Sequence, residues 1–216
     1  MNRILSCALI LLLVACSSDP NPEPMRLDYS NLGKIQLNTQ DLRIVNRAKN
    51  TSQAVPYVGH NFKPTLVEAV NHLAAERINA VGRLGHATLI IRDASVTEQP
   101  LDMASDFESL FTRQQATKYI GRVEVSLEAQ SPSSGAVSIA NAHAVHAVTL
   151  PEDPTEFEKY GAYEKLVNTL MDNLNSQLEK SIYTHMSGFL VGNNAVPALD
   201  QPVEPKRDSV LPAMSE

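Results

Sequence analysis

Tryptophan is absent from this chain of 216 residues, cysteine occurs only twice, and aromatic residues make up only 5% of it. Two cysteines are too few for a small domain held together by disulfides, and 9 glycines are too few for a collagen-like repeat. No apolar run approaches the roughly 20 residues of a membrane-spanning helix. The sequence therefore excludes a disulfide miniprotein, a collagen-like chain and a polytopic membrane protein.

What the chain does contain describes a folded domain of moderate size. Hydrophobic residues account for 43% and charged residues for 19%, which is enough apolar material for a core and argues against wholesale disorder. The 24 acidic residues outnumber the 18 basic ones, so the net charge is −6. Because a nucleic-acid surface has to neutralise phosphates with basic side chains, we predict no nucleic acid partner.

The start of the chain carries a targeting signal. A short basic start precedes 12 apolar residues, a pattern typical of a secretory signal peptide. The run ends in Leu13-Val14-Ala15-Cys16, which resembles the lipobox of bacterial lipoproteins. This resemblance implies that residues 1–15 are a removed signal peptide and that Cys16 receives the lipid. The alternatives are a secretory signal without lipid and an ordinary buried apolar helix.

Lipidation of Cys16 would leave the mature chain without a thiol, because Cys7 lies inside the signal peptide. We therefore predict no disulfide, no metal site and no cofactor. The acyl chains would hold the protein on a membrane without crossing it. Ser17 follows the cysteine, whereas Asp there is the usual inner-membrane retention signal in similar lipoproteins. The predicted location is the periplasmic leaflet of the outer membrane, with the inner membrane as the alternative.

Proline marks both flanks of the chain, which hold seven of its 13 prolines. Proline-rich polar segments form extended linkers rather than packed structure. We predict a lipidated cysteine and flexible tether at residues 16–33, a single domain at 34–192 and a disordered tail at 193–216.

Hydrophobic periodicity within that domain predicts an α+β fold. Alternation predicts strands, and three- to four-residue spacing predicts helices; the strands are expected at 35–44 (one long or two short), 86–96, 119–129 and 136–150, and the helices at 64–81 and from 156 onward. Thr155 and Glu158 form a capping box for the second helix, which we expect to extend about 35 residues, roughly 52 Å. The order β-α-β-β-β-α predicts a two-layer sandwich, with two helices on one face of about four mostly antiparallel strands.

Catalytic motifs are missing. The chain has no G-x-S-x-G, no H-E-x-x-H and no Walker A loop. His143 and His146, three residues apart in a predicted strand, fall on opposite faces and cannot share a metal. The Gly-Arg-Leu-Gly segment at 82–85 follows a predicted helix, so we interpret it as a helix C-cap and turn rather than a phosphate loop.

One apolar cluster suggests a binding surface. It lies at the end of the second helix, where the helix is expected to overhang the sheet, and comprises Ile182, Tyr183, Met186, Phe189 and Leu190. Uncovered apolar residues in such a place favour docking of a protein partner or contact with a membrane. The alternative is that the first strand or the segment 105–115 folds over them.

The lipobox, the tether and the order of elements together resemble the auxiliary lipoproteins of Gram-negative envelope machines, such as the lipopolysaccharide-assembly LptE family or the transport-auxiliary PqiC family. The resemblance implies a non-enzymatic accessory or assembly role with an envelope protein partner, but it does not name the complex. The alternative is a periplasmic hydrolase that uses dispersed side chains, for instance His86, Asp93 and Asp106.

Overall fold

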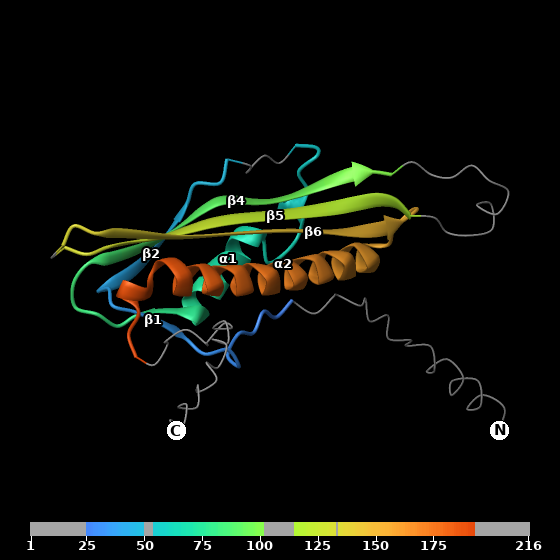
Figure 1. The fold of residues 1–216 in the computed structure, drawn as a ribbon. Helices are drawn as coiled ribbons and strands as arrows, with labels where there is room; N and C mark the ends of the chain where they lie inside the picture. Colours follow the sequence, from blue (N-terminus) through green and yellow to red (C-terminus); the bar gives the residue numbers. More distant parts are fainter. Residues whose placement is uncertain (1–24, 50–53, 102–114, 133, 193–216) are drawn as a thin grey trace, which may run out of the picture.

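The computed structural model describes residues 25–49, 54–101, 115–132 and 134–192. Two helices and a four-stranded sheet form two layers, with both helices on one face of the sheet (Figure 1). The elements are β1 (Ile35–Leu37), β2 (Asp41–Asn46), α1 (Leu66–Arg77), β3 (Ile78–Ala80), β4 (His86–Pro100), β5 (Gln115–Gln130), β6 (Val137–Pro151) and α2 (Glu156–His185), with 3₁₀ turns at Gly59–Asn61 and Ser187–Phe189. The predicted α+β sandwich is confirmed.

The main sheet has the order β2-β4-β5-β6. β4, β5 and β6 pair antiparallel along almost their whole lengths, whereas the short β2 runs parallel to β4. Alternation explains the long strands: Val123, Val125 and Leu127 are buried under the helices, while Arg122 and Glu124 are exposed on the opposite face. The mostly antiparallel pairing that the sequence predicts is confirmed for β4, β5 and β6.

The first helix is shorter than its spacing predicts. α1 ends at Arg77, and Ile78–Ala80 forms the short strand β3, parallel to β1. Val81, which we placed in the helix, donates its N–H to Leu37 O at 2.9 Å. The pairing with β1 overrides the helical spacing, and 82–85 is consequently a turn between two strands rather than a helix cap.

The second helix begins as predicted. The Thr155 side chain accepts the Glu158 N–H, and the Glu158 carboxylate accepts the Thr155 N–H, which completes the capping box. α2 spans 30 residues, about 45 Å, and ends at His185 because Met186 leaves helical geometry. Neither described helix combines the length and apolar character of a membrane span.

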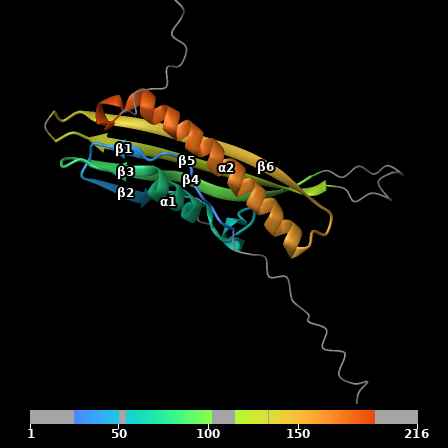
Figure 2. The same ribbon diagram turned by 90° about the horizontal axis from the view of Figure 1, so that it is seen from below.

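Small residues let α2 lie close to the sheet. Ala140, Ala142 and Ala144 of β6 are all buried beneath it, and a Cβ added to Gly121 of β5 would lie 2.3 Å from Leu170 Cδ1. Seen from the helix side, α2 runs diagonally across the sheet toward β6 (Figure 2). A large side chain on this stretch of sheet would push the helix outward.

An aromatic cluster closes the other end of the core. Phe62 stacks on Tyr163 with ring centroids 4.3 Å apart and meets Tyr119 edge-on at 5.8 Å. The Tyr163 hydroxyl donates to Pro64 O at 2.8 Å, so the ring is buried with its polar group satisfied. Burial raises the pKa of Tyr119 to about 12 and raises that of Tyr163 further.

Part of the predicted tether belongs to the domain. Met25 and Tyr29 are 8% and 5% exposed and join the core. Met25 N donates to the Tyr160 hydroxyl at 2.6 Å and Tyr29 N donates to Glu76 Oε2 at 2.9 Å. We call residues 25–29 the strap. The prediction of a free tether through residue 33 is wrong for these residues, because two large apolar side chains separated by four positions are enough to hold them. Residues 16–24 and the predicted tail lie outside the described residues.

Replacing either of two glycines with alanine should have opposite effects on stability. A Cβ at Gly82 would lie 2.5 Å from the Asn38 carbonyl carbon, so we expect Gly82→Ala to lower the free energy of unfolding by about 1–3 kcal/mol. Gly161 lies within α2 with nothing near its missing Cβ, so Gly161→Ala should raise it by roughly 0.5–1 kcal/mol. Urea denaturation of the two variants measures both; a neutral Gly82→Ala would contradict this packing.

Candidate functional site

The predicted docking cluster at the end of α2 is not an exposed surface. Ile182 and Met186 have no exposed area, and Phe189 is 8% exposed. Tyr183 and Leu190 are half-buried. The prediction of an exposed apolar surface at the overhanging end of the helix is therefore wrong for Ile182, Met186 and Phe189.

The first strand covers this cluster, which is the alternative stated above. Asn38 N donates to Phe189 O at 2.7 Å, and Val191 N donates to Gln36 O at 3.0 Å. These bonds fold the chain after α2 back along β1. The helix end therefore packs against its own domain, and its apolar residues complete the core.

The residues of the hydrolase alternative do not meet. His86 and Asp93 lie on the same strand, seven positions and about 23 Å apart, and Asp106 lies outside the described residues. His86 instead places Nδ1 2.6 Å from Asp41 Oδ1 on β2. This exposed pair joins the two strands, and its hydrogen bond lowers the pKa of Asp41.

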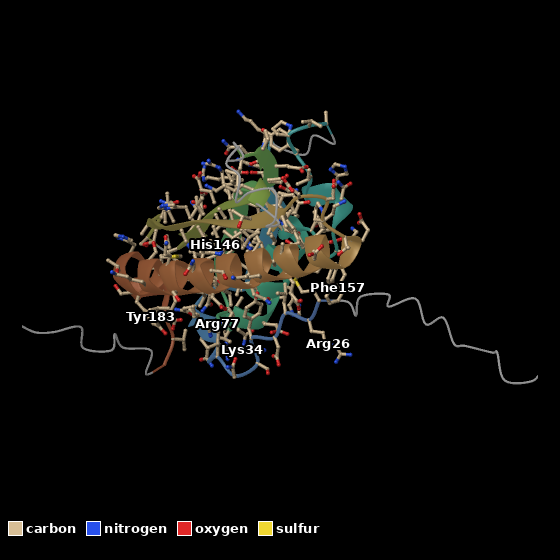
Figure 3. The ribbon with its side chains drawn as sticks, turned by 90° about the vertical axis from the view of Figure 1, so that its right-hand side faces the viewer. Arg26, Lys34, Arg77, His146, Phe157 and Tyr183 are labelled. Carbon is tan, nitrogen blue, oxygen red and sulfur yellow. The ribbon has the colours of Figure 1, made fainter. Side chains whose placement is uncertain are left out.

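The two histidines of β6 are separated as predicted. His143 is exposed and alternates with the buried alanines of β6, so it lies on the outer face of the sheet. His146 is half-buried on the helix side (Figure 3). Within the described ranges, no group of three His, Cys, Asp or Glu residues is arranged to hold a metal ion. Cys16, the predicted lipidation site, also lies outside those ranges.

A groove of about 690 Å³ lies at one end of the molecule, between the 82–85 turn and the β5–β6 turn. Leu84 projects beside it and is 66% exposed, and Phe189 contributes to its wall. Gly85 allows the backbone of this turn to adopt a φ of +79°, a conformation that residues with a side chain disfavour. The groove has mixed polar and apolar walls and no clustered titratable groups.

A buried cation joins the two helices. Arg77 is 3% exposed, and its guanidinium donates to Asn175 Oδ1 and to Glu179 Oε2, each at 2.8 Å. The adjoining cavity is only about 10 Å³, smaller than any organic ligand requires. Arg77 therefore ties α1 to α2 (Figure 3) and has a structural role.

β6 stands out as an edge strand without protection. Natural edge strands usually carry charges, proline or bulges that prevent pairing with another chain. The other edge, β2, is short and carries Asp41 and Arg43. β6 has 15 residues with no Asp, Glu, Lys or Arg, its single proline is its last residue, and it pairs with β5 without a bulge from Val137 to Leu150.

The direction of the backbone groups on β6 follows from one hydrogen bond. Asn141 N donates to the Ser181 hydroxyl of α2 at 3.0 Å, so its N–H points to the free edge. Alternate residues of an antiparallel strand direct both backbone groups to the same side. Residues 139, 143, 145, 147 and 149 therefore point the same way as Asn141, and among the described residues no strand pairs with them.

The outer face beside this edge is partly apolar. Val137, Ile139 and Val145 are 56%, 45% and 52% exposed. Val145 also lines an open depression of about 400 Å³, together with Arg122 and Glu124 of β5. The uncharged sequence of β6 was a usable signal for this surface, which the sequence analysis missed because it could not place β6 at the edge.

Comparison with known proteins gives only distant likenesses. No protein-family model and no curated protein matches the chain. A minor lipoprotein from Acinetobacter baumannii is similar over 72% of this chain and 98% of its own, with 10% identity and a TM-score of 0.38. Rare lipoprotein B from Shewanella oneidensis is similar over 67% and 94%, with 12% identity and a TM-score of 0.37. A protein from Xanthomonas campestris has 14% identity over 74% and 89%, with a TM-score of 0.28.

The His86–Asp41 pair predicts a measurable shift. Removing the imidazole in His86→Ala should raise the pKa of Asp41 toward its ordinary value, because the hydrogen bond that favours the carboxylate is lost. Since the folded-state pKa is lowered, the pair stabilises the fold at neutral pH, and this contribution disappears as pH falls through that pKa. Carbon-detected NMR titration of Asp41 reports the change, with His143→Ala as the control; an unchanged value would contradict the pairing.

Proposed function

We propose that the chain is a non-enzymatic accessory protein of a Gram-negative cell-envelope complex that acts by binding protein. In this proposal an acylated Cys16 holds it on the periplasmic leaflet of the outer membrane. The free edge of β6 is its binding surface and receives a strand from a protein partner, a mode in which backbone hydrogen bonds supply the affinity. The membrane is engaged through the lipid alone.

The anchor part of the proposal is supported by the lipobox and the strap. Leu13-Val14-Ala15-Cys16 is the specific sequence feature. Only eight residues lie between Cys16 and Met25, which is buried in the core. Since an extended chain spans at most about 3.6 Å per residue, Met25 stays within roughly 32 Å of the lipidated cysteine.

The observation that carries the binding role is the uncharged edge of β6. A long, flat edge with exposed valine and isoleucine is a template for another strand, which proteins normally avoid. The exposed side chains on the outer face would pack against those of the added strand. Both the uncharged edge and the exposed apolar side chains belong to the same strand, Val137–Pro151.

Replacement of the acylated cysteine tests the anchor. In cells labelled with a palmitate analogue, we expect Cys16→Ala to lose the label and to leave the membrane fraction, because the attachment atom is gone. Cys7→Ala, which alters the predicted signal peptide only, should keep both. Equal labelling of Cys16→Ala and the unaltered chain would refute lipidation at this residue.

A photo-crosslinker in place of His143 tests the binding surface in intact cells. We expect an adduct heavier than the chain, because a bound strand would lie within reach of this outward-facing position. The adduct should disappear when Val145→Lys adds a charge to the edge and persist in Val55→Lys, which changes a residue that is 92% exposed elsewhere. If no adduct forms with an unaltered edge, β6 is not the binding surface.

A further inference from the structure

We propose that the strand received by β6 is β6 of a second copy of this chain, paired antiparallel about a two-fold axis at His146. This inference rests on the proposed binding role of β6 and names its occupant. Homodimers with two-fold symmetry use the same patch on both copies. The patch must therefore be complementary to itself.

The open part of the edge has defined limits. At one end, the Asn141 N–H is already bonded to Ser181 of α2. At the other end, Pro151 has no N–H to offer. Between these limits the outward-pointing residues are 143, 145, 147 and 149, and the midpoint of this window is His146. A two-fold axis at that midpoint uses every open position in both copies.

Pairing in this register brings together compatible side chains. Val145 of one copy lies opposite Ala147 of the other, and His143 lies opposite Thr149. No Asp, Glu, Lys or Arg is present in β6, so no permanently charged side chains meet across the seam. His146, on the axis, lies opposite its own counterpart. The four outward residues of each copy would form about eight hydrogen bonds with their counterparts, close to the roughly ten of a typical protein interface.

The remaining edges explain why assembly would stop at two copies. Joining two β6 strands gives an eight-stranded sheet, four strands from each copy, with β2 at both outer edges. β2 is short and carries Asp41 and Arg43, which are features that discourage further pairing. The uncharged edge is thus consumed and only protected edges stay exposed.

The arrangement also suits two copies held on one membrane. An axis perpendicular to the sheet keeps the helices of both copies on the same side. The strap enters the domain on that helix side (Figure 1), and Figure 3 shows Arg26 and Lys34 on the far side of α2 from the sheet. Both chains would therefore leave toward the same surface, and shared anchoring raises the effective concentration of each copy for the other.

Paired cysteines in the full lipidated chain test the register. Two tagged versions are co-expressed, Val145→Cys in one and Ala147→Cys in the other, and a second set combines His143→Cys with Thr149→Cys. Because an acylated chain has no other thiol, mild oxidation of membranes should give a band of twice the chain mass that carries both tags. Val145→Cys with Phe157→Cys should give none. Absence of the band for both facing pairs would overturn the proposal.

Proline variants test the same seam without crosslinking. The Val145 N–H points to the free edge, so Val145→Pro should keep the circular dichroism spectrum and shift the mass of the detergent-extracted protein from two chains to one. Val137→Pro, of the same parity but outside the window, should stay dimeric. A monomeric wild-type chain overturns the pairing. If the photo-crosslinker at His143 captures a different protein, the proposal that a second copy occupies the edge fails, but β6 remains the binding surface. If it captures nothing, the proposed binding role of β6 fails as well.

Discussion

The close contact of α2 with β5 and β6 is the constraint on which the rest of the structure depends. A helix can lie this near a sheet only where the sheet offers little side-chain volume, and the chain supplies that with Gly121 and the three buried alanines of β6. Because these positions alternate with outward-facing ones, the same strand that accommodates the helix presents its other face to solvent. β6 therefore contributes small buried side chains to the core and also forms the exposed edge of the sheet.

Local signals predicted much of this fold. The Thr155 capping box and the alternation of β5 each depend on residues near one another in the chain, and both are confirmed. What could not be predicted depends on distant pairing. Ile78–Ala80 continues a helical pattern, and only the presence of β1 makes it a strand. The strap is similar, since Met25 and Tyr29 sit in a polar, proline-flanked stretch and become core residues through contacts with α1 and α2.

The candidate binding surface on β6 also depends on both local sequence and distant pairing. The uncharged composition of β6 is visible in the sequence, but it becomes meaningful only when the strand order places β6 at an edge. The apolar cluster at the end of α2 led to a wrong prediction of an exposed surface, because a distant part of the chain covers it. The helical spacing of the cluster is confirmed, but the chain after α2 returns along β1 and covers Ile182 and Met186. The sequence of α2 itself gives no sign of this contact with β1.

The strap has a mechanical consequence. A pull on the chain at residue 25 is received first by its bond to Tyr160 of α2 and then, at Tyr29, by Glu76 of α1. The two helices are themselves tied by Arg77 and Glu179. Tension from that direction therefore acts on both helices, and on the Arg77 link between them, before it reaches the first strand at Ile35.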